Sequence, residues 1–521
     1  MKFSLIFHTV KHLKPIQVYY QVLYRLKKIL NTSISVKKVP ESVALQLPYI
    51  LPAYSSFKNE NSFEFLNLQH TFSDIDWNYS EKGKLWTYNL NYFEFLNQEG
   101  MAKERGLTLI SDFIDKNAKH IDGYEPYPLA LRLLNWVKFL STHAIKETKI
   151  DKQLYTDALR LSKQIEYHLL ANHLIEDGFG LLFAAFYFKN ESLYRKSEKI
   201  LRKELKEQIL MDGGHYELSP MYHQIILFRM LDAIQLIEKN NWKNSLLADL
   251  KENASKMLAW MQNMQFSSGR MPQVNDTSMG IAPDTVNLRK LATYLKIEKI
   301  SLPLLASGYR MFKNQRMELL FDAGQIAPSY QPGHSHADNL NVLLEVDGEP
   351  ILVDTGISTY EKNERRQLER STVSHNTISV NEESSSQVWS GFRIGKRAKT
   401  KILSEDKNNI TAEHNGYRAF GLKLLRTLKV EENEFILIDR IIGDETGKKI
   451  IGHFHFHPSC KVEMEENTVV VNDKVVFTFQ GNVSFSQHEY DYANGFNQLL
   501  KSMKISYQMI DKEVFIVVKI K

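Results

Sequence analysis

The chain has 521 residues, of which 43% are hydrophobic and 24% are charged, and this composition excludes intrinsically disordered and fibrous proteins. Its length predicts two to four domains at roughly 100–200 residues each, while its net charge of +5 is too small to indicate nucleic-acid binding but suits a polyanionic substrate. The single cysteine, Cys460, excludes an intrachain disulfide and a thiolate metal cluster, so any metal would be bound by His, Asp or Glu.

The N-terminal segment is strongly basic and contains no acidic residue before Glu41. Its apolar run, Phe3–Phe7, is interrupted at once by His8 and Lys11, so we predict no signal peptide and a cytoplasmic location. No stretch of the sequence approaches the roughly 18 uncharged apolar residues of a transmembrane span. The basic residues of the segment are Lys2, Lys11, Lys14, Arg25, Lys27, Lys28, Lys37 and Lys38.

Residues 1–60 are predicted to form a basic arm that contains an amphipathic helix. From Pro15 to Leu30 the apolar residues follow helical spacing, and three cations lie among them. Two placements agree with this pattern, namely peripheral contact with an anionic membrane surface and docking on the main body of the protein. We favour docking, because Tyr19, Tyr20 and Tyr24 suit a partly polar protein interface.

Residues 61–300 are predicted to form an α/α toroid. Between Met101 and Leu295 apolar residues recur at three- and four-residue steps, which indicates amphipathic helices. The short loops between them imply antiparallel helical pairs, and a run of such pairs is typical of an α/α toroid or solenoid. We expect helices over residues 128–140, 151–170, 192–210, 219–237 and 244–264.

Residues 301–521 are predicted to form an antiparallel β-sandwich domain, which makes the chain an α+β multidomain protein. Residues 340–354 indicate two strands joined at Asp347-Gly348, a dipeptide that supplies the positive φ angles of a type I′ hairpin. Because an all-α part precedes an all-β part, we expect a ligand site at their junction. Further strands are expected over residues 434–440, 468–471, 475–480 and 514–521.

Residues 333–338, Gly-His-Ser-His-Ala-Asp, are the first candidate for chemistry. His334 and His336 are two positions apart, so an extended backbone would direct both side chains to one face. Together with Asp354 and His375, His336 would form a two-histidine, one-carboxylate set for a divalent metal, and we expect Zn²⁺ because imidazole nitrogen suits it. The alternative is that these groups satisfy one another at a buried strand end.

A competing metal candidate is the run His453–His457, in which three histidines alternate with two phenylalanines. A strand would place the histidines together on one face. We favour the first set, because this run has no carboxylate nearby and because polar alternation is common on a half-exposed strand.

Two polar segments of the helical part are further candidates. Asn172 and His173 lie at the start of a helical stretch, where Asn172 could serve as an N-cap. Ser219-Pro220 reads as an N-cap followed by a first-turn proline, which places Tyr222 in the opening turn of a helix. A tyrosine in such a place is more often an interface residue than an acid or base.

The loop of residues 271–280 contains Asn275 and Asp276 between glycine and proline residues. Its polar side chains suit contact with a hydroxyl-rich ligand. It is equally an ordinary connection between elements.

In their order and their α-then-β setting, these segments resemble the heparinase II/III-like polysaccharide lyases, a family with an N-terminal α/α toroid and a C-terminal β-sandwich. The resemblance is clearest from residue 333 to residue 377, extends back through residues 216–223 and 172–173, and covers the basic arm less securely. It implies β-elimination on a uronic acid-containing, acidic polysaccharide. Members of this class usually meet polysaccharide outside the cytoplasm, which makes a periplasmic or secreted location the alternative to a cytoplasmic one.

The resemblance also implies residue roles. Asn172 and His173 would stabilise the charge that develops on the substrate carboxylate, Tyr222 would be the acid/base, and His334 would act as the base or assist it. Tyr216 lies close enough in sequence to be the alternative tyrosine. The residues expected to contact the substrate are Tyr216, Glu217, Asn275 and Asp276, and those expected to bind the metal are His336, Asp354 and His375.

Two other functions remain open. The first is a non-catalytic polysaccharide-binding or capsule and exopolysaccharide biosynthesis-associated protein on the same scaffold. The second is a glycoside hydrolase, which needs two carboxylic acids that flank the scissile bond. The loop acids of the helical part do not forbid it, and they include Asp177, Asp212, Glu217 and Asp276.

Overall fold

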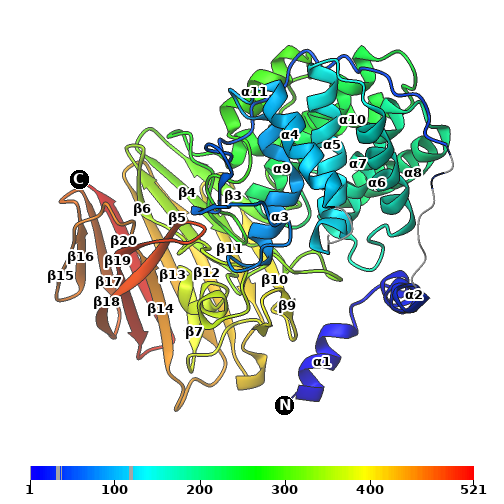
Figure 1. Ribbon diagram of the computed structural model, residues 1–521. Helices are drawn as coiled ribbons and strands as arrows, with labels where there is room; N and C mark the ends of the chain where they lie inside the picture. Colours follow the sequence, from blue (N-terminus) through cyan, green and yellow to red (C-terminus); the bar gives the residue numbers. More distant parts are fainter. Residues whose placement is uncertain (1, 31–35, 37, 117–120) are drawn as a thin grey trace.

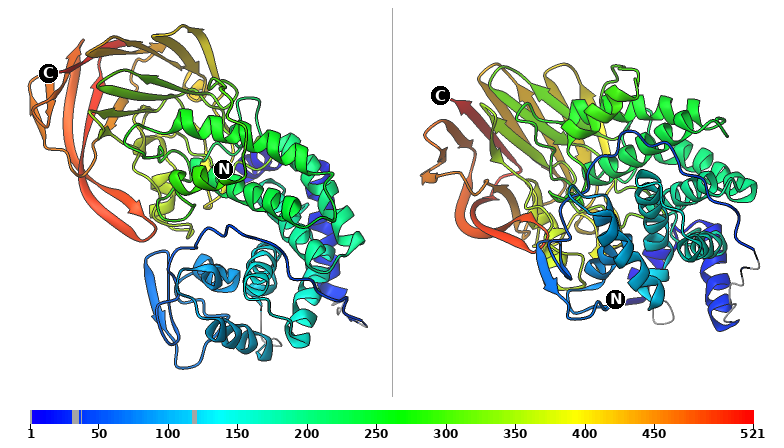
Figure 2. Two further views of the ribbon diagram at one scale, coloured as in Figure 1. Left: turned by 90° about the horizontal axis from the view of Figure 1, so that it is seen from above. Right: turned by 45° about the horizontal axis from the view of Figure 1, so that its top comes forward.

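The structure is a computed structural model that describes residues 2–30, 36, 38–116 and 121–521, without the side chains of residues 2, 3 and 27–30. A helical part is followed along the chain by a part built from antiparallel β-sheets, in the predicted order. The two parts lie side by side (Figure 1). Seen from above, the helices follow an arc whose last members lie against the sheets (Figure 2).

The helical part is built around one central helix. This helix, α7 (Ala171–Tyr187), packs against α5, α8 and α9, and nearly all of its side chains are buried. From Phe179 onward its sequence is apolar on every side, as a buried helix requires. The helices of the helical part are α3 (Lys84–Tyr92), α4 (Lys103–Asp115), α5 (Pro126–Thr142), α6 (Thr148–Lys163), α7 (Ala171–Tyr187), α8 (Glu191–Gln208), α9 (Pro220–Lys239), α10 (Leu247–Met264) and α11 (Thr285–Tyr294), with 3₁₀ turns at Glu94–Asn97 and Asp122–Tyr124.

The start of α9 follows its local sequence. Ser219 is the N-cap, and its hydroxyl accepts a hydrogen bond from the backbone N–H of Tyr222 at 3.4 Å, while Pro220 occupies the first turn. The predicted position of Tyr222 in the opening turn of a helix is therefore confirmed.

The predicted helix over residues 151–170 is wrong at its C-terminal end. It ends at Lys163, and after a turn the next helix begins at Ala171. Leu170 and Ala171 have φ angles of 63° and 58°, which are left-handed values that a continuous helix does not contain. This reversal places residues 172 and 173 in the first turn of the central helix.

The β part contains three principal sheets, and every strand pairing within them is antiparallel. Their orders are β10-β11-β12-β13-β20-β17-β16-β15, β18-β19-β14-β7 and β3-β4-β5-β6. The strands are β3 (Tyr309–Lys313), β4 (Met317–Asp322), β5 (Val342–Val346), β6 (Glu349–Leu352), β7 (Ile378–Val380), β8 (Val388–Trp389), β9 (Arg393–Ile394), β10 (Thr400–Glu405), β11 (Asn409–His414), β12 (Lys423–Val430), β13 (Glu434–Ile442), β14 (Ile450–His455), β15 (Val462–Glu465), β16 (Thr468–Val471), β17 (Val475–Gln480), β18 (Val483–Gly495), β19 (Gln498–Met509) and β20 (Glu513–Ile520).

The hairpin predicted for the β part is confirmed. Asp347 and Gly348 have φ angles of 52° and 79° and join β5 to β6, as a type I′ hairpin requires. Alternate side chains of the strands fill one core between the sheets, where Phe454, Phe477 and Tyr507 pack together. A short helix, α12 (Glu364–Glu369), and 3₁₀ turns at Thr372–Ser374 and Arg418–Phe420 interrupt the strands.

The two parts share a small core at their junction. Trp260 of α10 and Leu218 pack with Tyr309 of β3, and the Tyr309 hydroxyl donates a hydrogen bond to the Leu218 carbonyl oxygen at 2.7 Å. The Asp212 carboxylate accepts from the backbone N–H and the hydroxyl of Ser307 at 2.8 and 2.7 Å. These buried contacts fix the junction, at which the functional residues meet.

The N-terminal arm is docked on the body. Its helices are α1 (Lys2–Val10) and α2 (Pro15–Leu30), followed by a small hairpin of β1 (Ser62–Phe65) and β2 (Leu68–Thr71). The Gln17 amide donates to the Leu169 carbonyl oxygen at 3.3 Å. Residues 31–35 and 37 of the arm lie outside the described residues. Among the described helices, none combines the length and apolar character needed to cross a bilayer.

We predict that Arg426→Met lowers the free energy of unfolding by about 3–5 kcal/mol, because it leaves the Asp439 carboxylate buried without its counter-charge. The guanidinium of Arg426 also donates to the carbonyl oxygens of Leu340 and Asn376, both at 2.6 Å. Urea unfolding followed by circular dichroism measures the effect.

The matched control is Arg440→Met, one residue after Asp439 on the same strand. Arg440 pairs with Glu513 on the surface, so its loss should change the free energy of unfolding by less than about 1 kcal/mol. Equal urea midpoints for the two variants would contradict the interpretation.

Candidate active site

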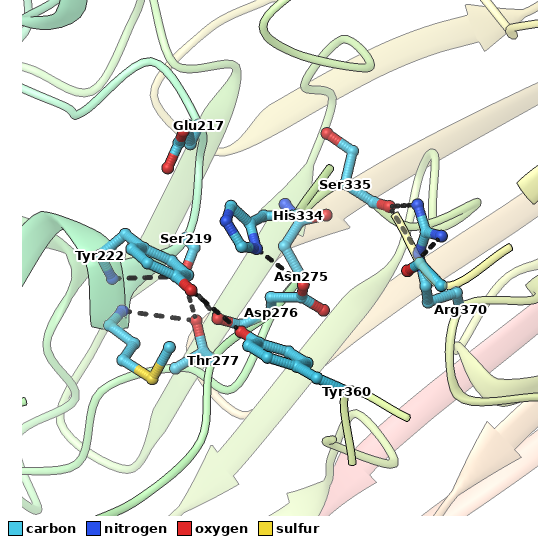
Figure 3. Close-up of polar contacts among 12 residues, drawn as sticks. Glu217, Ser219, Tyr222, Asn275, Asp276, Thr277, His334, Ser335, Tyr360 and Arg370 are labelled. Atoms are coloured by element: carbon cyan, nitrogen blue, oxygen red, sulfur yellow. Dashed lines mark hydrogen bonds and ion pairs between the residues drawn. The ribbon is translucent and has the colours of Figure 1, made fainter. Parts of the chain in front are cut away.

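The junction brings Tyr222 of the helical part against His334 of the β part (Figure 3). The two ring centroids lie 4.0 Å apart, and the His334 side chain is 11% exposed. A potential proton donor and a potential proton acceptor are therefore adjacent and accessible. They come from elements that are more than 100 positions apart in the sequence.

Asp276 is the buried centre of this arrangement. Its carboxylate contacts His334 Nδ1 at 2.8 Å and His336 Nε2 at 2.8 Å, and it pairs with both terminal nitrogens of Arg366 at 2.5 and 2.6 Å. Burial opposes ionisation of Asp276, but Arg366 and the two histidines hold its pKa well below the usual range. Asp276 is therefore a carboxylate at neutral pH.

The Asp276 carboxylate fixes the tautomer of His334. An ionised carboxylate only accepts hydrogen bonds, so Nδ1 of His334 must donate, and Nε2 of the neutral ring carries the lone pair. This Nε2 lies 3.4 Å from Nδ2 of Asn172. Nε2 of His334 thus faces the residues of the helical part.

Tyr222 keeps its proton. Burial, followed by the neighbouring Tyr360 hydroxyl at 3.3 Å, raises the pKa of Tyr222 well above its usual value. Tyr216, the alternative tyrosine, instead shares a hydrogen bond of 2.9 Å with Tyr330 and lines a junction cavity of about 530 Å³. The geometry therefore favours Tyr222 as the partner of His334.

Asn172 is held in place by Glu217. Asn172 is not the N-cap of α7, because it lies inside the first turn and Leu170 occupies the cap position. Its side-chain amide donates to both carboxylate oxygens of Glu217 at 3.0 Å, and its backbone N–H lies 3.2 Å from one of them. Glu217 is 1% exposed, so it orients Asn172 and presents little surface to a ligand.

His173 lies next to Asn172 and is shifted toward its protonated form. Burial opposes protonation of His173, but the Glu166 carboxylate, 2.9 Å from Nδ1, raises its pKa above the usual value. Its side chain is 31% exposed and its ring lies 4.7 Å from that of Tyr127. When His173 is protonated, its Nε2–H is available to an anionic ligand.

Asn275 and Asp276 lie behind the accessible residues. The Asn275 amide donates to the Leu218 carbonyl oxygen at 3.0 Å, and its oxygen accepts from the His336 backbone N–H at 2.9 Å. Asn275 is 4% exposed and Asp276 is fully buried. Because neither side chain reaches the surface, we assign them to positioning His334 and His336, whereas the sequence suggested direct contact with substrate.

The predicted metal ligands gather beneath this layer. His375 Nδ1 contacts the Asp354 carboxylate at 2.8 Å, and the rings of His336 and His375 lie 5.3 Å apart. Burial lowers the pKa of His336 to about 4, so its ring is neutral. The buried atoms that have no hydrogen-bond partner among the described residues include His336 Nδ1, His375 Nε2 and one oxygen of Asp338.

In the arrangement described, these donors do not surround a common point as the ligands of a bound metal do. Within the described part of the chain, no group of three or more His, Cys, Asp or Glu side chains is arranged to hold a metal ion. In the competing run of residues 453–457, two histidines already have hydrogen-bond partners. Both ring nitrogens of His453 bond to serine hydroxyls, at 2.9 and 3.1 Å, and His455 bonds to Asn376 at 3.1 Å. The unpartnered nitrogens of His336 and His375 therefore fit a metal better than that run does.

Sequence reasoning missed three residues of the site, Glu166, Tyr360 and Arg366. Arg366 lies in a charged stretch, residues 361–370, that reads as a solvated helix face. Only the tertiary structure buries its guanidinium against Asp276. No spacing in the sequence distinguishes it from the neighbouring Arg365.

Comparison with known proteins gives a consistent result. Residues 134–297 match the family described as "Heparinase II/III N-terminus" and residues 298–514 match "Heparinase II/III-like, C-terminal". A heparin-sulfate lyase of Bacteroides stercoris is 25% identical over 313 residues, which are 54% of this chain and 45% of that protein. A heparin-sulfate lyase of Pedobacter heparinus is 22% identical over 337 residues, 57% of this chain and 50% of that protein. The aligned regions span about half the length of these relatives.

Solved structures agree with the fold. A crystal structure of heparinase III has a TM-score of 0.71 at 17% identity and covers 99% of this chain and 93% of that chain. The heparan sulfate lyase of Pedobacter heparinus has a TM-score of 0.56 at 17% identity, with coverage of 88% and 81%. These similarities confirm the predicted α/α toroid followed by a β-sandwich.

We predict that Asp276→Asn lowers the free energy of unfolding by about 3–5 kcal/mol at neutral pH, because Arg366 is then buried without its counter-charge. The folded-state pKa of Asp276 is lower than its unfolded value of about 3.9. Its contribution is therefore present above that pH and is lost as the pH falls through the folded pKa. Urea unfolding at several pH values measures the free energy of unfolding of both proteins. The difference between the unmodified protein and Asp276→Asn should become smaller in acid.

Asp284→Asn is the matched control on the same connecting segment. Asp284 is the exposed N-cap of α11, where Asn caps about as well as Asp, so the free energy of unfolding should change by less than about 0.5 kcal/mol. If Asp276→Asn lowers the free energy of unfolding by the same amount at every pH, this result would contradict the proposed charge of Asp276.

Proposed function

Because the chain belongs to the heparinase II/III-like family, we propose that it is a polysaccharide lyase that cleaves a uronic acid-containing, acidic polysaccharide by β-elimination. The observation that carries the proposal is the contact of Tyr222 with a His334 ring whose Nδ1 is bonded to Asp276. The heparin-sulfate lyases among its relatives support a glycosaminoglycan as the class of substrate.

His334 would remove the proton from C5 of the uronate. Its Nε2 carries the lone pair, and the imidazolium formed on proton transfer would be stabilised by the Asp276 carboxylate 2.8 Å from Nδ1. The electron pair of the C5–H bond would form the C4–C5 double bond as the C4–O glycosidic bond breaks. Hydrolysis is not involved, so the product keeps an unsaturated uronate end.

Tyr222 would protonate the departing glycosidic oxygen. A raised pKa keeps its hydroxyl protonated, which suits a general acid, and its position over His334 places donor and base on the same sugar bond. The proton that His334 takes from C5 would then return to Tyr222, whose ring centroid lies 4.0 Å from that of His334.

Asn172 and His173 would neutralise the substrate carboxylate. The C5 proton is only weakly acidic while that carboxylate keeps its full charge. Hydrogen bonds to the carboxylate that strengthen as negative charge develops on it therefore lower the barrier to proton removal. The Glu166 carboxylate holds His173 toward its cationic form, and Glu217 holds the Asn172 amide rigidly.

The hydrolase alternative finds less support. A glycosidase needs two accessible carboxyl groups on opposite sides of the scissile bond. Asp177, Asp212, Glu217 and Asp276 are each at most 3% exposed. The non-catalytic alternative, a polysaccharide-binding or biosynthesis-associated protein, predicts binding of a uronate polymer without product.

We also propose that His336, Asp354 and His375 bind a divalent metal, for which Zn²⁺ is the expected ion. Two unpartnered buried ring nitrogens support this proposal. When bound, the ion would organise the site and would not attack the substrate. Cellular location stays a prediction.

We predict that Tyr222→Phe reduces β-elimination by about 10²–10⁴-fold, the usual contribution of a general acid, while the fold is retained. The measurement is ultraviolet absorbance of the unsaturated product during incubation with heparan sulfate, chondroitin, hyaluronan, alginate and bacterial capsular polysaccharides.

Tyr216→Phe is the matched control, since Tyr216 loses only its hydrogen bond to Tyr330 and should retain activity within about tenfold. Full activity of Tyr222→Phe would exclude it as the acid. Saturated products would indicate a hydrolase, and binding without product would favour the non-catalytic function.

For the metal, we predict stoichiometric zinc in the purified protein and a lower melting temperature after chelation, by about 2–4 °C for each kcal/mol of binding free energy lost. His375→Ala should lose the metal, whereas His457→Ala in the competing run should keep it. Mass spectrometry and thermal unfolding measure both. An unchanged melting temperature and no bound metal would exclude the site.

A further inference from the structure

The N-terminal arm contacts both parts of the protein through one face of each helix. In α2, the Tyr20 ring packs 4.7 Å from that of Tyr167, and Lys14, directly before this helix, pairs with Glu207. In α1, the Thr9 hydroxyl accepts a hydrogen bond from the Trp389 indole at 3.1 Å. The inner faces of α1 and α2 are thus used for docking on the body.

The opposite faces of the two helices are apolar and exposed. In each helix the exposed apolar residues recur at steps of one, three or four positions, which places them on one side. Of the 22 exposed large hydrophobic side chains among the described residues, seven lie within residues 6–26, so they are concentrated here. This outer face consists of Ile6, Phe7, Val10, Val18, Tyr19, Val22 and Leu26, which are between 43% and 62% exposed.

Exposed cations lie on the same helical arm as the outer face. Lys11 and Arg25 are exposed on the arm itself, and the sequence has no acid before Glu41. On the body, Lys396 and Arg418 lie close enough to α1 to lower the pKa of His8, after the effect of burial. Apolar residues bordered by cations are typical of helices that lie in the interface of an anionic bilayer.

We propose that the outer face of the N-terminal arm binds the surface of an anionic lipid bilayer, with α1 and α2 lying in the plane of the interface. A second copy of the chain is disfavoured, because pairing two arms would bring their cations together without an acidic partner. An acidic polysaccharide would use the cations but leave the apolar residues in water. A bilayer uses both.

Such contact would place the candidate active site close to the membrane. The segment beneath α2, residues 165–169, leads directly to Asn172 and His173. The segment beneath α1 leads to Phe392, whose ring lies 6.0 Å from that of His334. The proposal itself rests on the arm alone and stands apart from the proposed lyase activity.

The test is co-sedimentation of the full chain with vesicles of pure phosphatidylcholine and of phosphatidylcholine mixed with phosphatidylglycerol. We expect binding to the mixed vesicles only, weakened by high salt because the charges are exposed. A variant with Phe7, Val18, Val22 and Leu26 each changed to Ser should bind at least about tenfold more weakly. Lys11→Gln with Arg25→Gln should weaken binding at low salt.

The matched control changes four exposed apolar residues elsewhere, Ile121, Met211, Leu499 and Ile510, each to Ser, and should bind as the unmodified chain does. Circular dichroism verifies that all variants are folded. The proposal is overturned if the mixed vesicles are not bound, or if the control weakens binding as much as the arm variant. It is also overturned if light scattering shows a dimer that the arm variant converts to a monomer, since the outer face would then join two copies.

Discussion

The buried carboxylate of Asp276 is the constraint on which the candidate site depends. Asp276 belongs to the loop after the last long helix of the toroid, whereas its partners, His334, His336 and Arg366, all belong to the β part. A buried carboxylate without these partners would be costly, so the loop adopts this position only when the two parts are docked. The site therefore exists only in the assembled chain, although each part has its own core.

The same carboxylate couples two layers of chemistry. His334 and His336 are two positions apart and both reach Asp276, yet they differ in what their other ring nitrogens face. His334 Nε2 faces Asn172 at the accessible surface, whereas His336 Nδ1 is buried near His375 and has no partner in the part of the chain that the structure describes. Asp276 is thus one hydrogen-bond acceptor that the inner and outer layers share.

The helical part supplies the opposite side of the site through similar buried supports. Glu217 holds Asn172 and Glu166 holds His173, and both supports depend on the chain reversal at Leu170 and Ala171. The arm helix α2 packs on the segment that makes this reversal. The surface that we assign to a bilayer and the residues that we assign to substrate therefore share one structural element.

The sequence by itself determined the fold class and most of the chemical groups. Helical spacing, the Ser219 cap and the Asp347-Gly348 turn depend on residues that are close in sequence, so they can be recognised without knowledge of the tertiary structure. It also placed Asn172, His173, Tyr222 and His334 as candidates. Only the tertiary structure decided which tyrosine meets His334, that Asp276 is buried behind the site, and that Arg366 is its counter-charge. These are contacts between residues 58–112 positions apart, and their pairing is set by how the helical and β parts dock, which no local pattern encodes.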